Sequence, residues 1–164
     1  MRKADDLRAV LSARLPDLTR NPDLFWIEVK EGRIRATNTA GRGFEWSYTL
    51  ELTLLDATVH PSLVFLLVSD WLKTNQPDQV QPGSAGFAFE ADRVDSEKVD
   101  LVIRLHLTET VVVTTNPDGS ASLEHIAEPD YAALLGDAPL AGSTPVPFRA
   151  LSIDGTQVWP RPGT

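Results

Sequence analysis

The stretch Phe44-Glu45-Trp46-Ser47-Tyr48-Thr49-Leu50-Glu51-Leu52-Thr53-Leu54-Leu55 carries the clearest fold signal in this sequence. Large apolar side chains occupy every second position up to Leu54, and polar or acidic side chains stand between them. A period of two puts all the apolar side chains on one face of a β-strand. A strand with one apolar face is typical of an antiparallel sheet covered on one side. A register slip of one residue would turn that row to solvent.

Other segments show the same alternation and predict further strands of this sheet. Residues 25–36 alternate on both sides of a Glu31-Gly32 step, which predicts a β-hairpin that reverses there. Near the C-terminus, an Asp154-Gly155 step between apolar residues predicts a small second hairpin over 149–159. The remaining strands are expected at 87–90, at 99–107 with an extension over 111–114 past an irregularity at 108–110, and at 122–126 after a turn at 116–119.

Two helices are expected to cover the sheet. Leu7, Val10, Leu11 and Leu15 recur at helical spacing and predict a helix over residues 5–15. Pro16 ends it, because a residue before proline avoids the helical region. The second helix is expected over 61–75. It is apolar on nearly every side, so the sheet must share its coverage with the first helix, the C-terminal segment or another subunit.

The chain divides by composition into an α+β domain over residues 1–128 and an extension over 129–164. The extension holds six of the twelve prolines, which is typical of a strap rather than a core. The fold class predicted for the first part is α+β, with a mainly antiparallel sheet packed against two helices, followed by an extended C-terminal arm. A length of 164 residues agrees with a single domain of this kind.

Charge and composition exclude several classes of function. Residues 1–50 carry nine Lys/Arg against seven Asp/Glu, whereas residues 51–164 carry six against sixteen. Only Arg33, Arg35 and Arg42 form a basic group, so direct nucleic-acid recognition is not expected. The longest apolar run, residues 63–68, is too short to span a bilayer, and the acidic N-terminus does not resemble an export signal. The absence of cysteine excludes disulfides and thiolate chemistry.

The polar residues show no catalytic or metal-binding pattern. His60, His106 and His125 lack the spacing of a metal site. The acidic group between Asp92 and Asp100 lacks the spacing of a calcium loop, so a solvated acidic surface is the simpler interpretation. The nucleophile, phosphate-binding and dinucleotide-binding motifs are also missing. These observations favour a binding or assembly module without catalytic residues, cofactor or metal.

Several short segments, taken in order, resemble one protein family. They are Arg20-Asn21-Pro22-Asp23, residues 31–37 (EGRIRAT), residues 44–52 (FEWSYTLEL), Asp70-Trp71-Leu72, Asn75-Gln76-Pro77-Asp78, Val99-Asp100-Leu101, residues 107–111 (LTETV), Glu124-His125 and Glu128-Pro129. Their order and spacing over residues 4–130 resemble the tail completion protein R (GpR) family of contractile-tailed phages. Residues 131–164 match nothing in that family.

The resemblance implies a structural protein of a phage or phage-tail-like particle. Such a protein completes or caps the head-proximal end of the tail tube and prepares head–tail joining. The resemblance also implies contacts with tail tube, sheath and head–tail connector proteins, and assembly in the host cytoplasm into the virion tail. By analogy with tail-terminator proteins we expect a ring of six copies. Candidate residues for contacts with a neighbour or partner are Trp71, Leu67, Arg33, Arg35 and Trp159.

Three alternatives stay open on the sequence. A sheet wrapped around an apolar helix also occurs in hot-dog thioesterases, so a small enzyme with Asp70 as a catalytic carboxylate, or a ligand-binding protein, is an alternative. A tail-assembly chaperone would never enter the particle. The extension over 129–164 is either an arm across the adjacent subunit or a disordered tail.

Overall fold

The computed structural model describes residues 1–36, 42–129 and 150–159, apart from the side chains of 158 and 159. The N-terminal part contains helices α1 (Arg2–Arg14) and α2 (Pro16–Arg20), a 3₁₀ turn at Pro22–Leu24, and strands β1 (Phe25–Ala36) and β2 (Phe44–Ala57). Helix α3 (Pro61–Asn75) and a 3₁₀ turn at Pro77–Gln79 come next. The elements that follow are strands β3 (Ala88–Arg93), β4 (Val99–Thr115), β5 (Ala121–His125), β6 (Leu151–Ile153) and β7 (Thr156–Trp159).

The main sheet has five antiparallel strands in the order β1-β2-β4-β3, and β5 also pairs with β4. Strand β3 pairs with residues 99–104 of β4, and β5 pairs with residues 111–115 of the same strand. The two short strands therefore share one edge of β4, one after the other. The α+β class with an antiparallel sheet and two main helices is confirmed.

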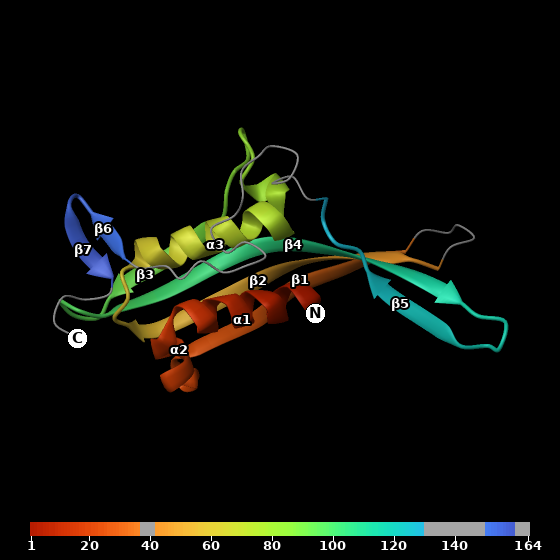
Figure 1. The fold of residues 1–164 in the computed structure, drawn as a ribbon, viewed down its shortest axis with the longest axis horizontal. Helices are drawn as coiled ribbons and strands as arrows, with labels where there is room; N and C mark the ends of the chain where they lie inside the picture. The colour runs from red at the N-terminus through yellow and green to blue at the C-terminus, as the bar shows by residue number, and fades with distance from the viewer. Residues whose placement is uncertain (37–41, 130–149, 160–164) are drawn as a thin grey trace.

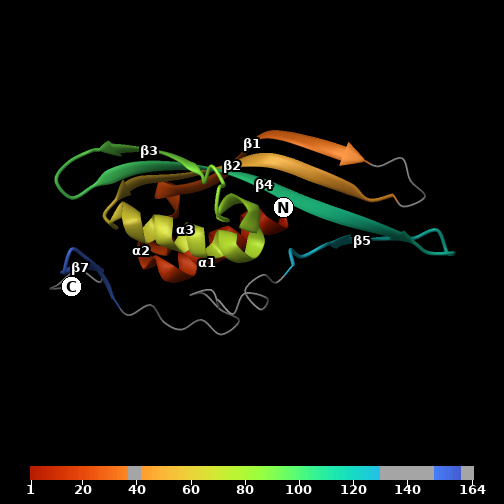
Figure 2. The same ribbon diagram turned by 90° about the horizontal axis from the view of Figure 1, so that it is seen from above.

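All three α-helices lie on one face of the sheet (Figure 2). The apolar row of β2 faces them, as the period of two predicts, and a matching row of β4 lies beside it. Helix α3 has the predicted bounds, and its buried face packs against the sheet and α1 of the same chain. The fully buried apolar side chains are Leu7, Leu11, Leu50, Leu52, Leu54, Val64, Val68, Leu72, Leu101, Ile103 and Leu105.

The predicted reversal at Glu31-Gly32 is wrong. Strand β1 continues from Phe25 to Ala36 and pairs with β2 along its whole length. The register shifts between Lys30 and Gly32, where Glu31 has a φ of 47°. A residue with positive φ in a strand forms a β-bulge when the partner strand runs past it, and a turn only when it does not. The predicted irregularity at residues 108–110 is also absent, because β4 is continuous there.

Two glutamine side chains fill the gap between β3 and β5. Gln79 Nε2 donates to the backbone oxygen of His106, and Gln76 Oε1 accepts from the backbone N–H of Thr108 at 3.0 Å. Both glutamines are buried. They come from the turn after α3 and complete hydrogen bonds that a neighbouring strand would otherwise make. The Gln76–Gln79 segment thus makes the edge of β4 continuous.

The predicted C-terminal hairpin is present as β6 and β7. Its turn residues Asp154 and Gly155 have φ values of 50° and 79°, the backbone that a two-residue type I′ turn requires. Leu151 packs against the core of the same chain. Residues 130–149 and 160–164 of the predicted extension lie outside the described residues.

Candidate assembly surface

The sheet is longer than the helical layer that covers it. Figures 1 and 2 show β1, β2, β4 and β5 running past the end of α1 and α3. We call this part the overhang; it comprises residues 32–36, 44–47, 110–115 and 121–125. In β2 every second residue from Tyr48 to Leu54 is buried, whereas residues 44–47 are only partly buried. Residues 32–36 of β1 and 121–124 of β5 are exposed.

The face of the overhang on the helix side carries apolar side chains. Ile34 pairs with Trp46, and the Phe44 ring stacks beside the Trp46 ring with centroids 6.1 Å apart. On β5, Leu123 lies on the same side and pairs with Val113. Ile34 is 71% exposed and Leu123 is 61% exposed, the highest values for large apolar side chains in the described ranges. Gly43 fixes the start of β2 here, because a Cβ on it would lie 2.8 Å from the backbone oxygen of Val111.

A buried carboxylate fastens the start of α1 to β4 at the inner end of the overhang. Glu109 is 3% exposed and continues the inward-facing row of β4. Its carboxylate accepts from the hydroxyl of Tyr48 at 2.6 Å and from the backbone N–H groups of Arg2 and Lys3 at 3.2 and 3.3 Å. The first N–H groups of a helix have no partner within the helix, and a carboxylate there also opposes the positive end of the helix dipole.

Burial and the hydrogen bond to Glu109 raise the pKa of Tyr48 far above its ordinary value. The phenol therefore stays protonated, and donates to Glu109, at pH values where a free tyrosine begins to ionise. His125 of β5 lies beside this group, with Nδ1 3.0 Å from the second carboxylate oxygen of Glu109 but without a hydrogen bond to it. The network joins the helical layer, the sheet centre and the first strand pair of the overhang.

A buried lysine extends the network toward the turn after α3. Lys3 is 1% exposed, and its ammonium donates to Gln76 Oε1 at 2.9 Å and to the Glu128 carboxylate at 2.7 Å. A buried charge is tolerated only when it is paired and hydrogen-bonded, and both conditions hold for Lys3. Gln76 thus connects the N-terminal helix with the edge of β4.

The face of the sheet away from the helices carries a row of charges across the four main strands. Arg104 of β4 bonds Glu51 of β2 at 2.9 Å and Glu90 of β3 at 2.7 Å. Lys30 of β1 bonds Glu28 at 2.9 Å and lies 3.9 Å from Glu51. The Arg104 guanidinium lowers the pKa of Glu90, whose hydrogen bond in turn raises the pKa of Arg104. This face is polar and largely solvated, as the alternation in β2 predicts.

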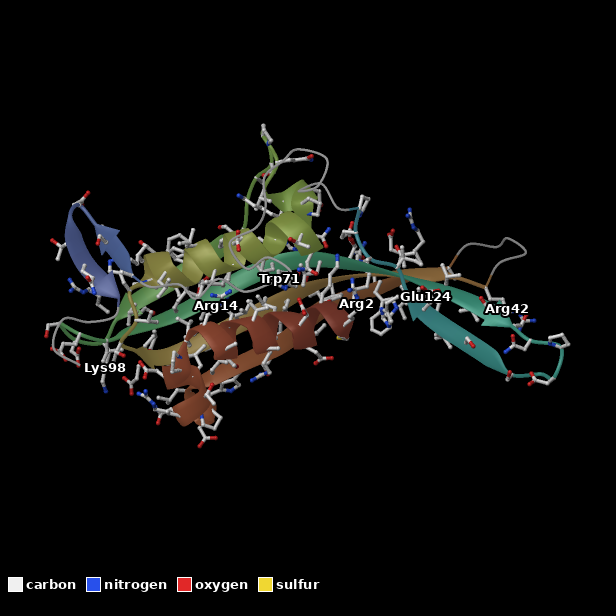
Figure 3. All side chains as sticks on the ribbon, viewed as in Figure 1. Arg2, Arg14, Arg42, Trp71, Lys98 and Glu124 are labelled. Carbon is white, nitrogen blue, oxygen red and sulfur yellow. The ribbon has the colours of Figure 1, made fainter. Side chains whose placement is uncertain are left out.

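The five predicted contact residues occupy different environments. Leu67 and Trp71 of α3 are 7% and 3% exposed, so both lie in the core and leave almost no surface for a neighbour. Figure 3 shows Trp71 on the side of α3 toward α1, where its Nε1 donates to Asp6 at 2.6 Å. Arg33 and Arg35 are exposed on β1 in the overhang, where Arg35 lies 3.3 Å from Glu45. The side chain of Trp159 is not among those described.

The candidate enzymatic residues do not come together. Asp70 is 5% exposed within α3, and His60 accepts from the backbone N–H of Ser62 as the N-cap of that helix. His106 lies on the polar face beside Thr49, at 3.1 Å. No group of three or more acidic or histidine side chains within residues 1–36, 42–129 and 150–159 could hold a metal ion. In the same ranges, no helix has the length and hydropathy needed to cross a membrane.

Glu109, Gln76 and Gln79 have structural roles that were not predicted from the sequence. Glu109 occupies one of the alternating positions of β4 that are otherwise apolar and buried. An acidic residue at such a position is the signal that could have indicated a buried polar network. Gln76 belongs to the segment Asn75-Gln76-Pro77-Asp78, which resembles the GpR family but indicates no structural role. Its role depends on Thr108 of β4, which lies 32 residues further along the chain.

Comparison with known proteins places the chain in a class of phage tail assembly proteins. The family model described as P2 phage tail completion protein R (GpR) matches residues 1–129. The chain is also 36% identical over 132 residues to tail completion protein R of Escherichia phage P2, an alignment that covers 79% of this chain and 84% of that protein. No solved structure matches.

The chain therefore belongs to the phage tail completion protein R (GpR) family, as the order of its short segments indicates. Members of this family are structural tail proteins without enzymatic activity, so the hot-dog enzyme alternative is set aside. The matched residues contain all five strands of the main sheet and helices α1 to α3. Strands β6 and β7 lie beyond the match.

Proposed function

We propose that the protein closes the head-proximal end of a phage tail tube and prepares that end to join the head. It acts as a ring of six copies in the virion tail or in a phage-tail-like particle. Its partners are the tail tube and sheath proteins and, where a head exists, the head–tail connector. The observation that carries the proposal is the match of the GpR family to residues 1–129.

The structure supports an assembly role through its surfaces. The helices cover one part of the sheet, and among the described residues of the overhang Ile34 and Leu123 are the large apolar side chains that stay most exposed. Exposed apolar side chains that gather on one face mark interaction sites in soluble proteins. The polar face with Arg104 and Glu51 has the solvated ion pairs of a surface that needs no cover.

Removing the gene from the phage or prophage tests the proposal. Electron microscopy of the resulting particles is expected to show tails of irregular length and tails without heads. The matched control restores the gene on a plasmid and recovers normal particles. Particles that mature normally without the gene contradict a completion role.

A tail-assembly chaperone is the competing function within the same class. Mass spectrometry of purified particles separates the two, because a structural component stays in the particle at a fixed ratio to the tube protein. Its absence from purified particles, together with defective tails in the deletion strain, favours the chaperone.

We also propose that residues 129–164 form an arm that reaches the adjacent subunit. In the structure the hairpin of β6 and β7 packs on its own chain through Leu151, so an arm has to carry the hairpin or residues 130–149 onto the neighbour. Deleting residues 130–164 and measuring mass in solution tests this. A smaller assembly of chains that remain folded by circular dichroism supports the arm, and an unchanged assembly contradicts it.

A further inference from the structure

We propose that neighbouring copies join through their sheets, with β1 of one copy pairing along β5 of the next. The inference rests on the proposed ring and names the surfaces that close it. Within the described residues no strand pairs with the free edge of β1 or with that of β5. Free strand edges present unpaired N–H and C=O groups, which are templates for pairing with another chain.

The side chains on the two edges match on both faces of the overhang. Toward the helix side, β1 presents Gly32, Ile34 and Ala36, while β5 presents Ala121, Leu123 and His125. Each edge thus has one large exposed apolar side chain with smaller or polar residues on either side. Pairing would place Ile34 of one copy beside Leu123 of the next and cover the two most exposed large apolar side chains of the described chain.

The opposite face of the same edges is complementary in charge. There β1 presents Arg33 and Arg35, and β5 presents Ser122 and Glu124. Figure 3 shows Glu124 on the overhang, on the same side of the molecule as Arg42. Opposite charges across a strand pair stabilise it, whereas two β1 edges brought together would oppose arginine to arginine. The charges therefore favour β1 with β5 over a symmetric pair of β1 edges.

The strand directions also agree with a ring. The four strands of the overhang alternate in direction in the order β1-β2-β4-β5, so β1 and β5 run opposite to each other. Rotation about an axis roughly along the strands keeps the direction of β1 in the next copy, which makes its contact with β5 antiparallel. Such a head-to-tail contact uses two different surfaces, and it closes into a ring when the rotation allows.

Cysteine cross-linking tests the contact cleanly, because the natural chain has no cysteine. The full-length chain is made with Ile34→Cys or Ala36→Cys in one variant and Ala121→Cys or Leu123→Cys in another. The four mixed pairs are oxidised with diamide and separated on non-reducing gels. At least one mixture is expected to give a covalent dimer, and the corresponding double variant a ladder that ends at the size of the ring.

The controls separate this contact from others. A mixture of Arg33→Cys with Leu123→Cys must stay uncrosslinked, because the two side chains would lie on opposite faces of the continuous sheet. Each variant alone must also stay monomeric on the gel. Each variant must keep the circular dichroism spectrum and melting temperature of the natural chain, and the substituted residues are solvent-exposed or lie on edge strands.

Every outcome decides between the proposals. A dimer of Ile34→Cys with itself indicates a symmetric β1 contact and overturns the inference. A ring in solution without any mixed cross-link overturns the β1–β5 contact and leaves the proposed ring standing. A monomer at every soluble concentration, without cross-links, overturns both.

Discussion

Replacing Tyr48 with phenylalanine removes one buried oxygen and leaves the packing of β2 in place. The lost hydrogen bond joins the phenol to the Glu109 carboxylate at 2.6 Å, and Tyr48 is 4% exposed. A hydrogen bond to a charged group contributes about 1.5–3 kcal/mol, and no water can take the place of the phenol in a packed core. We expect Tyr48→Phe to lower the free energy of unfolding by about 2 kcal/mol within that range.

Substitutions of Glu109 test whether that loss of stability comes from the hydrogen bonds between Tyr48, Glu109 and the start of α1. Glu109→Ala would leave the Tyr48 hydroxyl and the N–H groups of Arg2 and Lys3 without an acceptor, a loss of about 3–5 kcal/mol for a broken buried charge network. Glu109→Gln keeps the shape and removes the charge. The double variant with Tyr48→Phe and Glu109→Gln should lose about 1–3 kcal/mol less stability than the sum of the two single losses.

Urea unfolding followed by circular dichroism measures all four members of this cycle. The control is Thr49→Val, which lies next to Tyr48 on the polar face of the sheet. It loses only an exposed hydrogen bond to His106 and should change stability by less than about 0.5 kcal/mol. Additive losses for Tyr48→Phe and Glu109→Gln, or a control as damaging as Tyr48→Phe, would refute the role given to this network.

Three further predictions concern residues of the same core. In a Tyr131→Phe background, the ultraviolet band of phenolate should stay absent above pH about 10 until the protein unfolds. The raised pKa of Tyr48 means that stability is complete below that pH and falls above it, because the unfolded phenol ionises first. Gln76→Met should cost about 1–3 kcal/mol and speed hydrogen exchange at the Thr108 amide, since their bond is lost. Trp71→Ala should cost about 3–5 kcal/mol and fold poorly, whereas folded Trp71→Phe should keep the natural assembly mass; a folded Trp71→Ala chain that fails only to assemble would place Trp71 at an interface.

Local sequence patterns correctly predict the helices and strands that keep the same backbone structure when they pack against their neighbours. The apolar row from Phe44 to Leu54 predicts β2, and Pro61 with Asn75 before Gln76-Pro77 sets the bounds of α3. The C-terminal hairpin follows from Asp154-Gly155, because both positions adopt positive φ. In these cases the backbone preference and the buried face agree within a single segment.

Contacts between distant segments determine the features that local sequence patterns do not predict. Glu31-Gly32 has turn chemistry, but β2 continues past it and converts the step into a bulge. Glu109 would be unfavourable in a buried strand by itself, and it is stabilised there by the start of α1, more than one hundred residues earlier in the chain. The overhang likewise could not be predicted from the sequence, because the length of sheet that the helices cover depends on how these elements pack.

The position of Glu109 has a mechanical consequence. Strand β4 runs without interruption from the part of the sheet under the helices into the overhang. The Glu109 carboxylate binds α1 at the border between these two parts. A bend at that border would strip the carboxylate of its donors while it is still shielded from water. The hydrogen bonds of Glu109 therefore oppose a change in the angle between the overhang and the start of α1.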